Sequence, residues 1–136
     1  MKTLYDRSSQ QNHLNKNRPN QIWCCDITQK WTTEGWFYLA VVLDMYSRRI
    51  VGWSTGSNMR TELPLRALNQ ALVLRENPKG VIHHSDRGSQ YTSEQYLKRQ
   101  ETAELRTSFG SAGTIRFLSL FGLSPSFALV SIMLRW

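Results

Sequence analysis

The sequence predicts an α/β fold in which helices cover a mixed β-sheet, and three observations support this. Residues 21–55 contain three apolar runs joined by short polar connections, which is typical of an antiparallel meander. Residues 61–75 change to a helical spacing of apolar side chains. Residues 81–84 are a short apolar run after that helix, which predicts a strand parallel to one of its neighbours. The order of strands, helix, strand and helix is typical of an α/β architecture.

The first three apolar runs are each predicted to form a strand. The run Gln21–Gln29 has apolar side chains at both odd and even positions, which indicates a central strand covered on both faces. Trp36–Leu43 is a nearly continuous apolar run, and Ile50–Thr55 returns as the third strand. Asp44 lies where the second strand ends, so we expect it to cap the turn that follows.

Two helices and a fourth strand are predicted to complete the pattern. Thr61–Arg75 carries leucine and alanine at helical spacing, and an Asn-Pro pair followed by glycine ends it. Val81–His84 is the predicted fourth strand, and Ser85–Gln90 is a predicted loop. A second helix is expected over Ser93–Gln100, with Ser93 as its N-cap.

Composition narrows the possible functions. The 136 residues suffice for one domain, and 17 Lys and Arg against 10 Asp and Glu give a net charge of +7. This charge favours a polyanionic partner such as nucleic acid, or an anionic surface. Cys24 and Cys25 are adjacent, which excludes a disulfide-stapled secreted domain and predicts two buried thiols. We therefore expect a cytoplasmic, nucleoid-associated protein.

The two ends of the sequence differ from the middle. Residues 1–20 are polar and without periodicity, which indicates an arm or linker, and residues 21–100 are the patterned core. Residues 101–136 lack Asp and lose the pattern, so they are predicted to be a divergent tail. Within this tail, residues 117–134 carry no charge over 18 positions, but a proline and four serines disfavour a membrane span. We expect no membrane association.

Two carboxylates are candidates for chemistry. Asp26 lies within an otherwise apolar strand, where a carboxylate is costly unless it is paired or binds a cation. Asp86 follows the fourth strand, at the kind of position where α/β sheets open a ligand crevice. If neighbouring strands bring them together, they could hold Mg²⁺ or Mn²⁺. Alternatively, each is structural, and Asp86 forms an Asx turn before Gly88.

Four blocks of sequence resemble the integrase core of bacterial insertion-sequence transposases, in the DDE superfamily that includes retroviral integrases. They are NQIWCCDIT (20–28), GWFYLAVVLD (35–44), YSRRIVGW (46–53) and HSDRGSQY (84–91). The resemblance implies an RNase H-like fold and assigns Asp26 and Asp86 as the first two acids of an Asp-Asp-Glu triad. It also implies that two Mg²⁺ or Mn²⁺ ions support DNA cutting and joining at element ends and target DNA.

The third acid of the triad is not where the resemblance places it. The family spacing leads to position 122, which is Gly122, and Glu94, Glu101 and Glu104 all come too early. This predicts a truncated or frameshifted core that lacks its fifth strand and its glutamate helix. We expect such a chain to be catalytically inactive and to bind at most one ion weakly. Alternatively, it is a non-catalytic nucleic-acid-binding or regulatory fragment that pairs with an intact transposase.

Several other residues have both a functional and a structural interpretation. Lys30, Arg48 and Arg49 are candidates for DNA phosphate contacts, although surface solvation would explain each of them equally well. His84 is either near the active site or structural. The tryptophans of the core blocks are expected to be buried aromatic residues: Trp23, Trp36 and Trp53.

Overall fold

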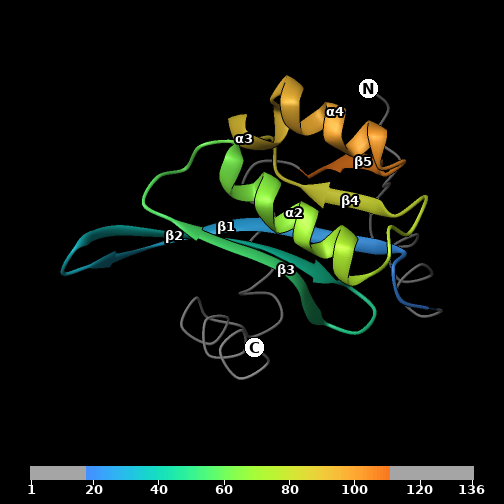
Figure 1. Cartoon of the computed structure of the whole chain (residues 1–136), viewed down its shortest axis with the longest axis horizontal. Coiled ribbons are helices and arrows are strands. Elements are labelled where there is room, and N and C mark those ends of the chain that lie inside the picture. The colour runs from blue at the N-terminus through green and yellow to red at the C-terminus, as the bar shows by residue number, and fades with distance from the viewer. Residues whose placement is uncertain (1–17, 111–136) are drawn as a thin grey trace.

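A five-stranded mixed sheet forms the centre of the computed structural model, which describes residues 18–110 (Figure 1). Strands β1 (Ile22–Thr32), β2 (Gly35–Asp44) and β3 (Arg49–Gly56) form an antiparallel meander. The predicted meander is therefore confirmed. Apolar residues occupy both faces of the first half of β1 and of most of β2, as covered strands require.

The second half of the core crosses back over the sheet. Helix α2 (Glu62–Leu74) leads into β4 (Ile82–Ser85), which pairs in parallel with β1. Two helices follow, α3 (Ser89–Thr92) and α4 (Glu94–Thr102), and then β5 (Arg106–Phe109). The strand order is β3-β2-β1-β4-β5. The mixed sheet with flanking helices is the predicted architecture, and the parallel fourth strand is confirmed.

The fifth strand corrects one expectation from the sequence. The segment that supplies it was expected to be missing, yet β5 pairs in parallel with β4, with Ser85 opposite Phe109. The pairing continues past the strand end, because the Gly110 N–H donates to the Ser85 carbonyl at 2.8 Å. The loss of pattern after residue 100 therefore does not coincide with the end of the sheet. The remaining tail, residues 111–136, lies outside the described part of the chain, and the uncharged stretch 117–134 lies within it.

A short helical turn is the second difference. The sequence predicts a loop up to Gln90, but α3 already begins at Ser89. The Tyr91 and Thr92 N–H groups both donate to the Gly88 carbonyl. This one-turn helix is too short for a periodic pattern, so hydrophobic spacing does not reveal it. No helix within residues 18–110 is long and apolar enough to span a membrane.

The larger apolar core lies between the sheet and the helices. It joins alternate residues of the strands, such as Trp23, Cys25 and Val42, to buried leucines and alanines of α2 and to Tyr91 and Tyr96. A second cluster occupies the opposite face, and its described members all come from β2 and β3: Phe37, Leu39, Val41, Leu43, Ile50 and Trp53. The alternation of the two clusters along β2 follows from the period of two in a strand.

The three tryptophans expected in the core do not share one environment. Trp23 is fully buried and Trp53 packs against the second cluster, as expected. Trp36 is 48% exposed, so the expectation of a core position is wrong for this residue. The reason is local. Trp36 lies beyond the part of β2 that pairs with β3, in the hairpin where only β1 accompanies it.

The N-cap predicted at Ser93 is confirmed and gives a small, specific test. The Ser93 hydroxyl accepts a hydrogen bond from the Tyr96 N–H at 3.3 Å and donates to the Gln90 carbonyl at 3.0 Å. We expect Ser93→Ala to lower the free energy of unfolding by about 1 kcal/mol, since it removes the cap of α4. Urea unfolding measures this. Ser89→Ala is the control, because Ser89 is exposed, and an equal loss in both variants would contradict the cap's role.

Candidate active site

Parallel pairing of β1 with β4 places the two candidate acids at one edge of the sheet. The last paired residues are Cys24 and His84. Asp26 and Asp86 each follow two positions later along their own strand or its extension. Parallel neighbours advance together, so the two aspartates lie at the same level beyond the carboxyl end of β4. Both side chains are half-buried, as a site that is reached from solvent requires.

Backbone hydrogen bonds orient both carboxylates. Asp26 Oδ1 accepts from the Ile27 N–H at 2.9 Å, and Asp86 Oδ1 accepts from the Gly88 N–H at 2.7 Å. The second of these is the Asx turn that the sequence offered as a structural role for Asp86. It is compatible with a ligand role, because a carboxylate has several lone-pair sites and a single N–H uses one of them.

Tyr91 lies near both acids and was not singled out from the sequence. Burial raises the pKa of Tyr91 well above its ordinary value, and the nearby carboxylates of Asp26 and Asp86 raise it further. The Tyr91 hydroxyl is buried and has no hydrogen-bond partner within the described residues. An orphaned buried hydroxyl beside two carboxylates suits a site that holds water or a hydrated ion. The feature of the sequence that could have indicated Tyr91 is its position in the block HSDRGSQY (84–91), which also contains Asp86.

The two histidines of β4 belong to different faces. Burial lowers the pKa of His83 to about 3 and that of His84 to about 4, so both are neutral at pH 7. His83 Nε2 is 2.6 Å from the Tyr96 hydroxyl, inside the helix-covered core. His84 Nδ1 is 2.9 Å from Ser108 Oγ and thereby links β4 to β5. His84 therefore has a structural partner on the strand that the sequence did not predict.

The three candidate DNA-binding residues are not brought together. Lys30 is exposed and lies further along β1 than Asp26, opposite Phe37 in the hairpin. Arg48 and Arg49 belong to the opposite end of the meander, where Arg49 pairs with Asp44 and Asp44 pairs with Trp23 at the start of β1. The strand register therefore places Asp26 between Lys30 and the arginines.

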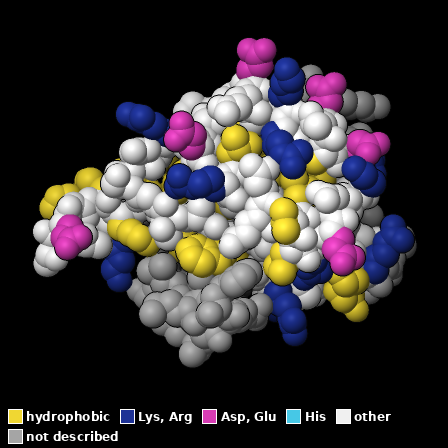
Figure 2. Space-filling view, in the orientation of Figure 1, with side chains coloured by type: hydrophobic (Ala, Val, Ile, Leu, Met, Phe, Trp, Pro, Cys, Tyr) yellow, Lys and Arg dark blue, Asp and Glu magenta, His cyan; other side chains and the backbone are white. Residues whose placement is uncertain are grey.

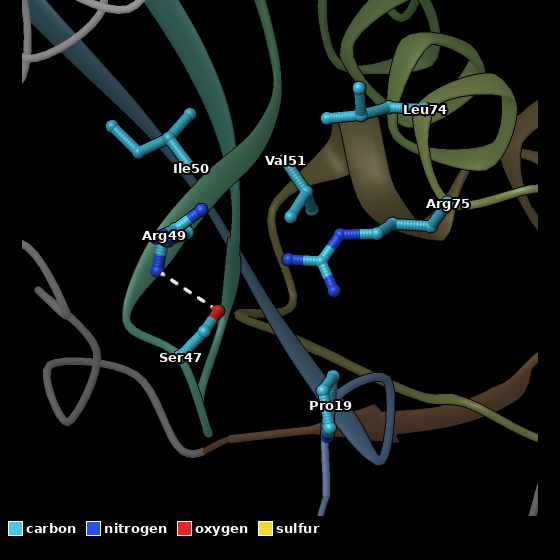
Figure 3. Close-up of a pocket in the computed structure, with 7 residues that line it drawn as sticks. All are labelled: Pro19, Ser47, Arg49, Ile50, Val51, Leu74 and Arg75. Carbon is cyan, nitrogen blue, oxygen red and sulfur yellow. Dashed lines mark hydrogen bonds between the residues drawn. The ribbon is translucent and has the colours of Figure 1, made fainter.

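A pocket lies at the end of the sheet that carries Arg49 (Figure 3). Its volume is about 990 Å³. Its lining residues come from the start of the chain, the β2–β3 turn, β3 and the end of α2: Pro19, Ser47, Arg49, Ile50, Val51, Leu74 and Arg75. Arg75 also donates to Asp44 Oδ2 at 3.2 Å. Asp44 is fully buried and accepts from the Tyr46 N–H as well, which confirms that it caps the turn.

The later glutamates lie on exposed surfaces. Glu94 and Glu101 are exposed residues of α4. Glu104 forms an exposed ion pair with Lys79 at 3.0 Å, and its carbonyl accepts from the Gly80 N–H before the start of β4. Glu104 is therefore at the end of β4 opposite Asp86. Residues 18–110 contain no group of three His, Cys, Asp or Glu side chains that could hold a metal ion. Position 122 lies outside the described residues.

The sheet order, the parallel crossover and the flanking helices define an RNase H-like α/β fold. Among solved structures, the HTLV-2 integrase catalytic core domain in complex with magnesium matches with a TM-score of 0.62 and 21% identity, over 70% of this chain and 62% of that chain. A simian T-cell lymphotropic virus intasome in complex with the PP2A regulatory subunit B56 gamma matches with a TM-score of 0.63 and 18% identity. That match covers 90% of this chain and 40% of the other. At these identities the likeness concerns the fold.

Sequence comparison then identifies the family. Residues 16–114 match the model of the integrase core domain, and the chain belongs to that family. It is 46% identical over 95 residues to the transposase InsF of insertion sequence IS3A from Escherichia coli K12. It is also 46% identical over 96 residues to the transposase of insertion sequence element IS629 from Shigella sonnei. The matched segments cover 70% and 71% of this chain, but it spans only about a third of the length of these relatives.

Proposed function

We propose that this chain is the core segment of an insertion-sequence transposase. Its two acids, Asp26 and Asp86, would take part in cutting and joining the phosphodiester bonds of DNA. The observation that supports this most directly is the placement of Asp26 and Asp86 at one level of two parallel strands, at the carboxyl end of β4. The relatives that share 46% identity over the same segment are transposases. The net charge of +7 suits a DNA partner.

The donor set of this site fits Mg²⁺ or Mn²⁺. Both ions prefer oxygen ligands, and two carboxylates together with waters are a common arrangement for Mg²⁺. Bound there, such an ion would polarise the scissile phosphate and acidify a water molecule. Asp26 and Asp86 would hold the ion in fixed orientations, because each Oδ1 is already bonded to a backbone N–H. With two acids instead of three, we expect one weakly held ion.

A direct prediction follows for metal binding. Calorimetric titration of the full chain with Mn²⁺ should show one weak site. Asp26→Asn and Asp86→Asn should each weaken it by at least about tenfold, since loss of even an outer-shell partner commonly has that effect. Glu94→Gln is the matched control because Glu94 is exposed on α4 and should leave the titration unchanged. Two tight sites, or a site insensitive to both aspartate variants, would contradict the proposal.

We further propose that the chain as it stands does not join DNA strands. Loss of one triad acid leaves the metal incompletely held, so the relevant test is a strand-transfer assay on element-end DNA with Mn²⁺. We expect no product from the chain itself or from Gly122→Glu. That glutamate would lie three residues before Pro125, close to a point where a helix ends or kinks.

A coding sequence restored to the family's frame after residue 110 should give product. Clear product from the original chain would contradict the inactivity and give another residue the third role.

The alternative function is regulatory. A fragment that binds nucleic acid but lacks strand transfer could pair with an intact transposase in the cytoplasm and reduce its activity. Mixing the chain with an intact homologue in the strand-transfer assay distinguishes the two functions, because only the regulatory fragment lowers the homologue's product.

A further inference from the structure

The β1–β2 hairpin extends beyond the rest of the sheet (Figure 1). β2 pairs with β3 only from Tyr38 onward, and β1 pairs with β4 only up to Cys24. The outer part of the hairpin is therefore a two-stranded ribbon. The space-filling view shows hydrophobic side chains on this protruding end (Figure 2). Isolated two-stranded ribbons are only marginally stable in water. The exposed apolar side chains at this tip are not buried by the rest of the sheet, so their presence requires an explanation.

The exposed aromatic side chains of the tip form a cross-strand pair. Trp31 is opposite Trp36 in the β1–β2 register, and their ring centroids are 5.2 Å apart in an edge-to-face arrangement. Their exposures are 64% and 48%, the largest for any aromatic residue of the described core. The pair stabilises the ribbon, but it also leaves a large part of both rings facing solvent.

The position of the pair connects it with the acid site. Trp31 follows Asp26 by five positions on the same strand, a span of about 17 Å at the rise of an extended chain. That span equals about five stacked nucleotides at ~3.4 Å each. Lys30 lies between the two positions and shares the strand face of Asp26 by alternation, whereas Trp31 and its partner Trp36 lie on the opposite face. A nucleic acid strand at the acids that continues along the ribbon would therefore reach the tryptophan pair by passing round the edge of the hairpin.

The charge of the tip indicates which part of a nucleic acid it contacts. Lys30 and Glu34 are its charged residues, both are exposed, and their charges cancel. A neutral tip attracts phosphates weakly, whereas exposed indole rings stack on bases of any sequence. Paired bases are not available for such stacking, so the suitable ligand is a run of unpaired nucleotides.

We propose that the Trp31–Trp36 pair is a stacking site for unpaired nucleotides of the DNA substrate, at the tip of the hairpin whose first strand also carries Asp26. This inference rests on the proposed action on DNA and adds to it a contact that selects opened strand over duplex. It predicts that the tryptophan pair contributes to affinity without contributing to the salt dependence of binding, which comes from phosphate contacts.

Fluorescence-anisotropy titration of the full chain, without metal, tests the proposal with a labelled mixed-sequence oligonucleotide, single-stranded or annealed to its complement. We expect Trp31→Ala and Trp36→Ala each to weaken binding of the single strand by about tenfold, the effect of losing one stacked base. Duplex binding should change little, and the salt slope should stay the same. Trp36→Phe keeps a stacking ring and should restore most of the affinity. Tyr46→Ala is the matched control, because Tyr46 is 46% exposed but lies in the β2–β3 turn at the other end of the sheet.

The outcomes separate the hairpin site from the proposed function. If the wild-type chain binds DNA and both alanine variants bind the single strand equally well, the stacking site is refuted while the transposase function stands. If those variants instead change only the mass of the particle in sedimentation, the tip is a self-association surface and the proposal is wrong. If the wild-type chain binds neither probe, the proposed function fails, and the stacking site fails with it. Circular dichroism of each variant establishes that the fold is intact.

Discussion

Gly52→Ala is expected to lower the free energy of unfolding by about 3 kcal/mol, at the upper end of what overpacking of a core costs. Gly52 lies on β3 directly beneath α2. A Cβ atom at this position would overlap the Ala67 carbonyl oxygen and lie 2.9 Å from both the Cβ and the N of Ala71. These are mostly backbone atoms, so no rotamer change relieves the contact. Helix α2 would have to move away from the sheet, and buried leucines would lose contact with β3.

Gly56→Ala is the control for this prediction. It lies on the same strand, but the atom nearest to its added Cβ is Leu63 Cδ1 at 3.3 Å, the flexible end of a side chain. We expect its stability to change by less than about 1 kcal/mol. Urea unfolding followed by tryptophan fluorescence measures both variants. Equal midpoints for the two variants would show that β3 and α2 pack less closely than the structure indicates.

His83 is expected to make the fold sensitive to mild acid. Burial lowers the pKa of its imidazole from 6.5 to about 3 in the folded chain. Below the unfolded pKa, the unfolded chain binds a proton that the folded chain does not, so stability falls as the pH falls from about 6.5 towards the folded value. Between about pH 7 and pH 5, where most carboxylates stay ionised, this residue alone should account for a loss of about 2 kcal/mol.

His83→Gln separates this contribution from all others. Glutamine does not titrate, and its amide can still reach the Tyr96 hydroxyl that His83 contacts at 2.6 Å. The variant can be less stable at neutral pH, so the informative quantity is the slope of unfolding free energy against pH. We expect the slope to decrease by about 1.2 kcal/mol per pH unit near pH 5.5. The same slope in the variant and the wild type would mean that His83 is protonated in the folded chain.

The sequence predicts the fold well where hydrophobic periodicity is strong. Both faces of β1 are apolar up to Asp26, and α2 has regular apolar spacing, so type and approximate limits follow directly. β5 is different. Arg106–Phe109 has one apolar residue in four, and its buried position depends on pairing with β4 and on the Ser108–His84 hydrogen bond. Such an element is determined by tertiary contacts, which a local pattern does not contain.

The candidate site was also predictable only in part, because some of its features depend on tertiary contacts. Asp26 stands out because a carboxylate is unusual in an apolar strand, and Asp86 because it follows a strand. Their common level depends on the parallel register of β1 and β4, which the sequence does not specify. Tyr91 was not singled out because an aromatic residue in a loop has no distinctive pattern. The exposure of Trp36 was missed because tryptophan content alone does not show where the strand pairing ends.

All strand pairing of the described sheet is complete by Gly110, whose N–H bonds to Ser85 one residue before Asp86. The described sheet therefore ends next to the residue that precedes Asp86. A different segment joined at Gly110, such as a fusion partner or a synthetic helix, would change the groups near the carboxyl end of β4. It would leave the order of the strands intact. If Asp26 and Asp86 hold a metal ion as proposed, we expect that a third ligand can be introduced by exchanging the segment after Gly110 without altering the sheet.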